Sequence, residues 1–154
     1  MHRDWAALDN GASVESFTGP RFYGCDPKKA FDLRLDRGWM TRLLRHTGGG
    51  PSVVVDLGRD IDITSFGMDP TLVCFGGSYA PYSLKAFQIW TKTATGSWVR
   101  AWTQETRLPL YTLSDLVPSR GTDGVRYIKL VMLSSHSGYY VGMTELTVRG
   151  APSV

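Results

Sequence analysis

The chain has 154 residues, of which 42% are hydrophobic and 20% are charged, enough for one globular domain with a full core. Its apolar runs stay below the ~18 residues of a membrane-spanning helix, and its first ten residues lack the apolar region of a signal peptide. The net charge is +3, and the basic residues are scattered apart from Arg34, Arg37, Arg42 and Arg45. Because nucleic-acid-binding proteins usually carry a basic stripe or cluster, we do not expect nucleic acid as a partner.

Short runs rich in β-branched and aromatic residues follow one another along the chain, punctuated by glycine and proline. Strands bounded by turn residues, without helices between them, predict an all-β sandwich or barrel. Alternation with one apolar face favours two sheets that pack together. The expected strands are 52–58, 62–70, 84–91, 97–102, 125–133 and 143–150.

Three long loops lie between these runs, at 40–51, 69–83 and 134–142. Long ordered loops on a β scaffold often carry function. These loops are rich in aromatic residues, namely Phe75, Tyr79, Tyr82, Tyr139 and Tyr140.

The tryptophans fall mostly in strand or turn patterns. For Trp39, Trp90, Trp98 and Trp102 we expect core packing, and for Trp5 a position that caps the sandwich.

The two cysteines, Cys25 and Cys74, are not part of a CxxC motif, which argues against a zinc site. They form either two buried free thiols or one disulfide. A bridge would close a loop of about 50 residues and stabilise the fold by roughly 4 kcal/mol.

The sequence contains none of the common catalytic signatures: HExxH, GxSxG, GxxxxGKS and GxGxxG are all absent. Nothing places two carboxylates across a cleft for glycoside hydrolysis. We therefore do not expect the chain to be an enzyme.

Six motifs follow one another along the chain: AFD at 30–32, Trp39 seven residues after Asp32, VVVDLG at 53–58, TATGSW at 93–98, VRYIKL at 125–130 and MTELTVRG at 143–150. In this order they resemble the discoidin, or coagulation factor 5/8 type C, domains and the similar family 32 carbohydrate-binding modules. The resemblance covers roughly residues 10–150 of a single module spanning 1–154. It implies a β-sandwich jelly roll of the galactose-binding-like fold, with ligand bound by loops at one end.

The chain also resembles discoidin modules attached to secreted actinobacterial hydrolases and peptidases. That resemblance implies an extracellular location, a covalently attached catalytic domain and a Cys25–Cys74 disulfide between loops at one end of the sandwich.

Members of the family commonly hold a structural calcium, and the resemblance places Asp32 and Glu145 among its oxygen ligands. This chain departs from the pattern at three positions. Arg37 replaces the usual hydroxyl residue, Leu33 the usual glycine and Arg34 the usual Asn or Asp.

We expect Arg37, in preference to Arg34, to replace the metal by bridging Asp32 and Glu145. The alternative is a calcium held by Asp32, Asp36, Glu145 and backbone carbonyls. No other cofactor is expected.

The family's loop site, mapped onto this chain, implies an aromatic platform for the apolar face of a sugar ring, with polar partners for its hydroxyls. The expected function is noncatalytic: the module binds carbohydrate and targets an attached extracellular enzyme to glycan or cell wall. The platform residues are Tyr79, Tyr82, His136, Tyr139 and Tyr140, and the polar partners are Arg42 and His46.

Two alternatives remain at this point. A discoidin-type module could bind a protein or phospholipid membrane surface through apolar residues beside the basic segment RLLRH. The chain could also be a purely structural accessory domain. The apolar candidates are Leu43, Leu44, Leu72, Val73 and Phe75.

Overall fold

The computed structural model describes residues 3–22, 24–43, 50–74 and 77–154. Short connections join its strands, and none of the described helices is long and apolar enough to cross a membrane. The strands are β1 (Ser13–Phe17), β2 (Trp39–Arg42), β3 (Ser52–Asp69), β4 (Val73–Cys74), β5 (Gly77–Ser78), β6 (Leu84–Thr93), β7 (Val99–Glu105), β8 (Leu113–Leu116), β9 (Val125–Ser135), β10 (Tyr140–Met143) and β11 (Glu145–Pro152). Three 3-10 helices accompany them: η1 (Leu8–Asn10), η2 (Pro27–Phe31) and η3 (Ala80–Tyr82).

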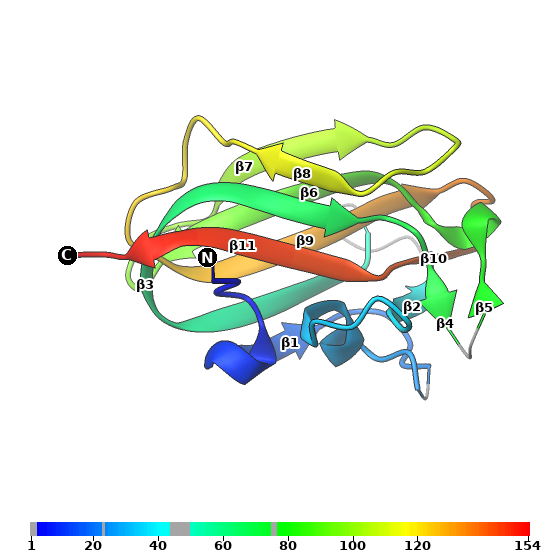
Figure 1. Cartoon of the computed structure of the whole chain (residues 1–154), viewed down its shortest axis with the longest axis horizontal. Helices are drawn as coiled ribbons and strands as arrows, with labels where there is room; N and C mark the ends of the chain where they lie inside the picture. The colour runs from blue at the N-terminus through cyan, green and yellow to red at the C-terminus, as the bar shows by residue number, and fades with distance from the viewer. Residues whose placement is uncertain (1–2, 23, 44–49, 75–76) are drawn as a thin grey trace.

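The strands form two layers (Figure 1). In the first layer β1, the first half of β3, β9, β6 and β7 lie side by side as antiparallel neighbours. In the second layer the second half of β3 pairs with β11 on one side and with β8 on the other. This arrangement confirms the expected all-β sandwich.

Strand β3 passes from one layer to the other by curling at the left end of Figure 1. Gly58 lies in this curl with φ of 81°, and a Cβ there would approach the Gly11 carbonyl oxygen to 2.6 Å. Only glycine meets both requirements at low cost. The amide of Gly58 also donates to the Asp56 carboxylate at 2.8 Å, which fixes the bend.

The core lies between the layers and is built from alternate residues of each strand. In β6, for example, Phe87 and Ile89 are buried while Gln88 and Trp90 face outward, as the period of two in a strand requires. The largest fully buried side chains are Trp39, Phe31, Phe66, Phe87, Leu57, Ile61, Met68, Leu72, Leu84, Ile89, Ile128 and Leu130.

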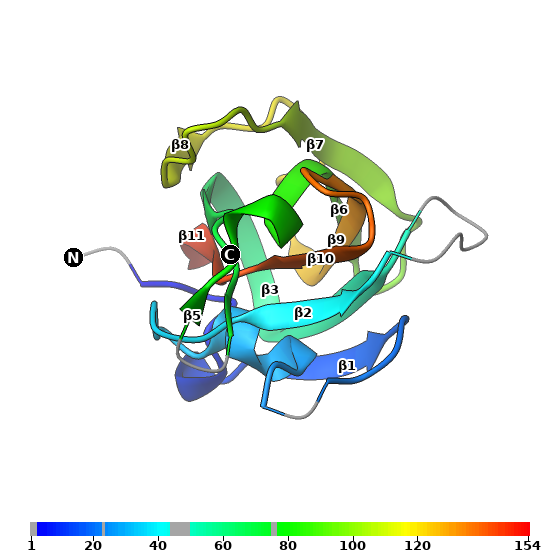
Figure 2. The same ribbon diagram turned by 90° about the vertical axis from the view of Figure 1, so that its right-hand side faces the viewer.

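The end of the sandwich that faces the viewer in Figure 2 carries β10 on β2 and the short pair β4–β5. Gly142 allows β10 to approach β2 closely, because a Cβ there would lie 2.3 Å from the Trp39 carbonyl oxygen. A bridge between Ser83 and Gly142 joins the end of η3 to β10. The loops at this end are therefore tied to one another through their backbones.

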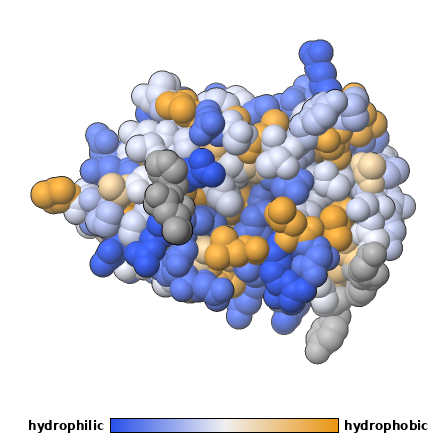
Figure 3. All heavy atoms as spheres, viewed as in Figure 1, coloured by the Kyte–Doolittle hydropathy of each residue, from blue (hydrophilic) through white to orange (hydrophobic). Residues whose placement is uncertain are grey.

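The face carrying β11 and β8 shows apolar residues as separate areas among hydrophilic ones (Figure 3). In the part of the chain that the structure describes, the exposed large apolar side chains likewise come from many elements. Scattered exposed apolar residues of this kind are ordinary for a globular protein.

Most of the expected strands are present. The runs 52–58 and 62–70 form the two halves of β3, and the runs 84–91, 125–133 and 143–150 fall mainly in β6, β9 and β11. The run 97–102 was predicted two residues early, since β7 begins at Val99. The short strands β1, β2, β8 and β10 were not predicted, because four or five residues show too little alternation to stand out.

The tryptophans divide into two groups. Trp39 is buried, Trp102 packs against the core, and Trp5 closes the sandwich with its Nε1 donating to the Gly150 carbonyl at 2.9 Å. Core packing was the wrong prediction for Trp90 and Trp98, which lie half-buried outside the core cluster, each near the ammonium of Lys129.

Candidate functional site

A disulfide supports the loops at the end of the sandwich. Cys25 and Cys74 form the bridge with their Cα atoms 5.9 Å apart, which confirms the expected pairing. Both are buried with Leu72 in a small cluster separate from the main core. Phe22, Met40 and Tyr82 pack against this cluster. The bridge thus joins the loop before η2 to the loop that carries η3.

Five aromatic side chains from three chain segments meet above the disulfide, and we call them the aromatic cluster. Tyr140 lies at its centre, and its ring centroid is 4.6 Å from that of Tyr139, 5.2 Å from Tyr82 and 5.7 Å from Phe22, all edge to face. Tyr79 stacks on Tyr82 at 6.4 Å. Such aromatic pairs contribute beyond the area they bury.

Two members of the aromatic cluster are open to solvent, since Tyr79 is 39% and Tyr139 is 54% exposed. The others are half-buried and hold them in place. Backbone bonds also fix η3, with the Tyr79 amide on the Leu72 carbonyl at 2.9 Å and the Leu72 amide on the Ser83 hydroxyl at 2.8 Å. The exposed rings are therefore preorganised, which lowers the entropic cost of binding a ligand.

Arg42 lies against the aromatic cluster. Its Nη2 donates to the Tyr139 hydroxyl at 2.9 Å, and its guanidinium carbon lies 5.3 Å from the centroid of that ring. Within the described part of the chain, the Nε of Arg42 is buried and has no hydrogen-bond partner. A buried donor without a partner carries a desolvation cost.

The imidazole of His136 is hydrogen-bonded to Thr106. Its Nε2 lies 3.0 Å from the Thr106 hydroxyl, which itself donates to the Leu84 carbonyl at 2.8 Å. Because that hydroxyl proton is already used, Nε2 of His136 is the donor in this pair. Burial, followed by the charge of Lys85, lowers the pKa of His136.

The remaining expected residues divide in two. His46 lies outside the described residues, as do Leu44 and Phe75 of the membrane alternative. Leu72 is fully buried and Leu43 packs against the core. These two residues cannot act as exposed apolar anchors, so the prediction was wrong for them.

The loop between η2 and β2 carries the expected arginine contact with Asp32. The Nε of Arg37 lies 2.5 Å from Asp32 Oδ2, and the neighbouring Arg34 pairs with Asp36. Among the described residues Arg37 has no ion pair with Glu145. The predicted bridge across both carboxylates therefore exists only at its Asp32 end, and Oε1 of Glu145 accepts from the Leu33 amide instead.

Glu145 instead receives a backbone donor. The Leu33 amide donates to its Oε1 at 3.0 Å, while its Oε2 is buried and has no partner among the residues that the structure describes. Glu145 is 4% exposed. Burial, aided by the charges of Asp32, Asp4 and Asp69, raises its pKa to about 9, against the opposing effect of the Leu33 amide. The side chain therefore holds a proton at neutral pH.

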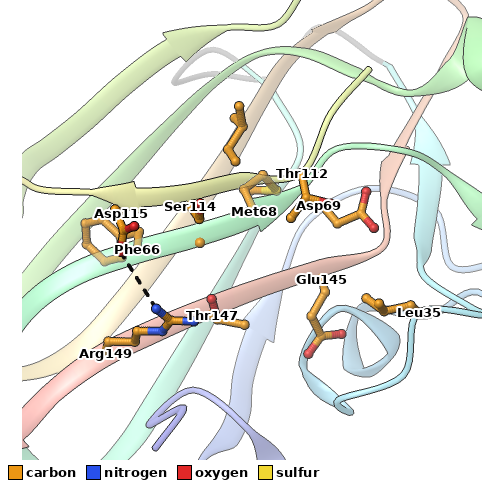
Figure 4. A pocket seen from close by; sticks show the side chains of 12 residues that line it. Leu35, Phe66, Met68, Asp69, Thr112, Ser114, Asp115, Glu145, Thr147 and Arg149 are labelled. Carbon is orange, nitrogen blue, oxygen red and sulfur yellow. Dashed lines mark ion pairs between the residues drawn. The ribbon is translucent and has the colours of Figure 1, made fainter. Parts of the chain in front are cut away.

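Glu145 also lines one end of a cavity of about 170 Å³ between β3, β8 and β11. Figure 4 shows Glu145 beside Leu35 at this end, while Arg149 and Asp115 pair at the far end of the cavity with an N–O distance of 3.8 Å. The walls between these ends are mainly apolar, formed by Phe66, Met68 and Leu113 among others. An apolar surrounding of this kind favours the neutral form of Glu145.

These contacts do not fit a calcium ion. Calcium requires six to eight oxygen ligands, but here a backbone N–H points at Glu145 and both oxygens of Asp32 accept from arginine residues, Arg34 N and Arg37 Nε. The described part of the chain has no group of three metal-binding side chains in position to hold an ion. The loop therefore places hydrogen-bond donors at Asp32 and Glu145, where the resemblance implied calcium ligands.

One residue of the aromatic cluster, Phe22, was not among the selected site residues. Two adjacent aromatic residues, Phe22 and Tyr23, in a glycine- and proline-containing loop give no periodic signal. Only the neighbouring Cys25, once the disulfide is formed, brings Phe22 to Tyr140.

Solved structures of similar fold cover nearly the whole chain. A fragment of a putative chitobiase from Bacteroides thetaiotaomicron has a TM-score of 0.75 at 18% identity, over 100% of this chain and 95% of that one. The family 32 carbohydrate-binding module of NanJ from Clostridium perfringens, in complex with galactose, has a TM-score of 0.67 at 17% identity, over 97% and 99%. An F5/8 type C domain from Bacteroides fragilis has a TM-score of 0.61 at 15% identity, over 92% and 98%.

The chain has the fold of these modules. The fold that the motif order implied is thus confirmed, although no family model matches the sequence and no curated protein matches it significantly. At these identities the similarity concerns the fold, and a function must be argued from the site itself.

Proposed function

We propose that this chain is a noncatalytic carbohydrate-binding module whose ligand site is the aromatic cluster with Arg42. The observation that carries the proposal is the pair of exposed rings, Tyr79 and Tyr139, held by half-buried aromatic neighbours at the loop end of the sandwich. Aromatic faces bind the apolar side of a sugar ring, and planar donors such as arginine bind its hydroxyls.

The fold supports this proposal. Similar structures include a module in complex with galactose. We propose galactose-terminated glycans as the first ligands to examine, with affinity in the modest range of a single module. His136 and His46 remain predictions as polar partners, His136 because it is bonded to Thr106 and His46 because it lies outside the described residues.

We further propose that the module targets a covalently attached extracellular enzyme to its substrate surface. The last strand, β11, ends at the left of Figure 1, whereas β4, β5 and β10 lie at the right. A domain linked after β11 would therefore leave the aromatic cluster uncovered. The buried disulfide is consistent with an oxidising compartment.

The test is binding to a glycan array that includes galactose-terminated oligosaccharides. Tyr79→Ala and Tyr139→Ala should each weaken binding about tenfold or more, equivalent to ~1.4 kcal/mol, while the thermal unfolding temperature stays near that of the wild type. Tyr111→Ala is the matched control, because Tyr111 is 72% exposed and makes none of the ring contacts of the cluster.

Unchanged binding by the Tyr79 and Tyr139 variants would reject this site. Binding of the wild type to anionic liposomes but to no glycan would favour the membrane alternative. Binding to neither would favour a purely structural accessory role.

A further inference from the structure

A second group of aromatic and basic side chains gathers on the outer face of the first layer. Strand register places Trp90 of β6 opposite Lys129 of β9 and opposite Arg100 of β7, and Lys92 opposite Tyr127. Residues directly opposite one another in paired strands project to the same face. These side chains are thus neighbours although they come from three strands.

Trp98, which ends the connection between β6 and β7, lies over the lysines. The Nζ of Lys129 is 4.6 Å from the Trp98 ring centroid and 5.4 Å from that of Trp90. The Nζ of Lys92 is 5.0 Å from the Tyr127 centroid and 5.9 Å from that of Trp98. Each ammonium is therefore held between two rings by cation–π attraction.

Two arginines complete the group, because Arg100 and Arg120 border a shallow hollow of about 390 Å³ lined also by Trp90, Trp98 and Val99. The Nε of Arg120 donates to the Arg100 carbonyl at 3.1 Å, which keeps that side chain at the rim. We call the whole group the outer basic face; it consists of Trp90, Lys92, Trp98, Arg100, Arg120, Tyr127 and Lys129.

No carboxylate neutralises the four cations of the outer basic face. All 14 Asp and Glu residues lie within the described part of the chain, and its ion pairs involve other basic residues. Asp56, opposite Tyr127, pairs with Arg126 at 2.7 Å, and Glu105 of β7 pairs with Lys85 at 3.5 Å. The face therefore presents uncompensated positive charge around half-buried aromatic rings.

We propose that the outer basic face is a second binding site, for an acidic polysaccharide that carries carboxylate or sulfate groups. Sugar rings would lie on the indoles of Trp90 and Trp98, while the anionic groups would pair with the arginine and lysine side chains around them. Arginine is suited to this role because its planar guanidinium donates two parallel hydrogen bonds to one carboxylate or sulfate.

Polysaccharide is favoured over nucleic acid by the extent of the surface. A single-stranded nucleic acid follows a basic groove over ~4–16 nucleotides. Here two of the cations, Arg100 and Arg120, line one hollow, and the two lysines lie beside it against the aromatic rings. One or two charged sugar residues would fill this surface. The outer basic face shares no residue with the aromatic cluster, so the two proposed binding sites can be tested independently.

The test measures binding of the full chain to polygalacturonate and to dextran sulfate, with neutral dextran as the uncharged reference. The wild type should bind at least one acidic polymer, and binding should weaken as salt rises. Arg100→Gln/Arg120→Gln and Trp98→Ala should each weaken binding about tenfold, and Trp98→Phe should restore most of the loss. The Tyr79→Ala variant should bind the acidic polymer like the wild type.

Lys28→Gln/Arg107→Gln removes the same charge from exposed positions outside this face and should leave binding nearly unchanged. An equal loss in that control would mean that net charge alone attracts the polymer, and would overturn the proposal. Absence of binding to both acidic polymers would overturn it as well. So would tighter, Trp98-dependent binding of single-stranded DNA, which would assign the face to nucleic acid.

Discussion

At the scale of single residues, Leu33 and Glu145 show how the loop before β2 keeps its shape with different chemistry. Leu33 has φ of 62°, in the left-handed region that favours glycine. This conformation directs the Leu33 amide to Glu145 Oε1. The buried carboxyl thus obtains one donor at the cost of a strained backbone at Leu33.

Replacing Leu33 with glycine should stabilise the protein. The left-handed conformation destabilises a leucine by ~1–2 kcal/mol, and glycine relieves this strain. The greater freedom of glycine in the unfolded chain reduces the gain by ~0.4–1 kcal/mol. The side chain is 51% exposed, so little burial is lost. We expect Leu33→Gly to raise the free energy of unfolding in urea by about 0.5–1 kcal/mol.

The control is Leu35→Gly in the same loop. Leu35 is 65% exposed and has no positive φ, so glycine there should only destabilise. A Leu33→Gly variant no more stable than the wild type would contradict the strain at this position.

Glu145 should make stability fall as pH rises. Its pKa is about 9 in the folded protein against an ordinary value of 4.5, so folding takes up a proton between these values. The contribution of this proton to the free energy of unfolding is complete below pH 4.5 and is lost progressively as pH rises toward 9. Glu145→Gln, which mimics the protonated form, should match the wild type in urea unfolding near pH 4.5 and gain on it steadily up to pH 9.

Asp56→Asn provides the opposite case, because hydrogen bonding to Arg126 lowers the pKa of Asp56. That carboxylate stabilises the fold above the ordinary pKa of aspartate and ceases to do so as pH falls below it. The variant should therefore be less stable than the wild type at neutral pH and approach it in acid.

Equal pH profiles for Glu145→Gln and the wild type would rule out a buried, protonated Glu145.

At the scale of elements, the disulfide and the loop pairings create the aromatic cluster. The short strands β2, β4, β5 and β10 are tied together by backbone bonds and by the small buried cluster around Cys25 and Cys74. A covalent link that closes a long loop lowers the entropy of the unfolded chain and so stabilises the folded loops.

Removing the disulfide should destabilise the fold and disturb the site together. Cys25→Ser/Cys74→Ser opens a closure of 49 residues, for which the loop-entropy account gives about 4 kcal/mol. Because Phe22 and Tyr82 pack against the bridge, glycan binding should also weaken. Urea unfolding and array binding, compared with the wild type before and after reduction, measure both effects.

A loss of less than about 1 kcal/mol would mean that the bridge adds little to loops already held by their backbone bonds. Retained glycan binding in the reduced protein would mean that the aromatic rings hold one another without it.

At the scale of the whole molecule, the charges are distributed unevenly in a way that the sequence conceals. Lys92, Arg100, Arg120 and Lys129 are spread over 38 positions and read as scattered. Pairing of β6 with β7 and β9 brings three of them together, and the Arg120 loop adds the fourth. The basic cluster that composition did not reveal is a product of strand register.

The sequence by itself determined the fold class and most of the long strands, whereas the Cys25–Cys74 pairing was implied only by the family resemblance. The run 84–91 was predicted as a strand from its alternation alone, because a strand has a period of two residues. The order of six short motifs was enough to show the resemblance to a known fold. It also showed that Arg37, Arg34 and Leu33 depart from the calcium pattern. These are local properties, carried by neighbouring residues.

Only the tertiary structure decided which side chains meet. The aromatic cluster joins residues 22, 79, 82, 139 and 140, the Glu145 carboxyl meets the Leu33 amide across 112 positions, and Trp90 and Trp98 face outward rather than into the core. Such contacts depend on strand register and on the path of the loops. A shift of one residue in register reverses the face that a side chain occupies, and nothing in a local pattern fixes that choice.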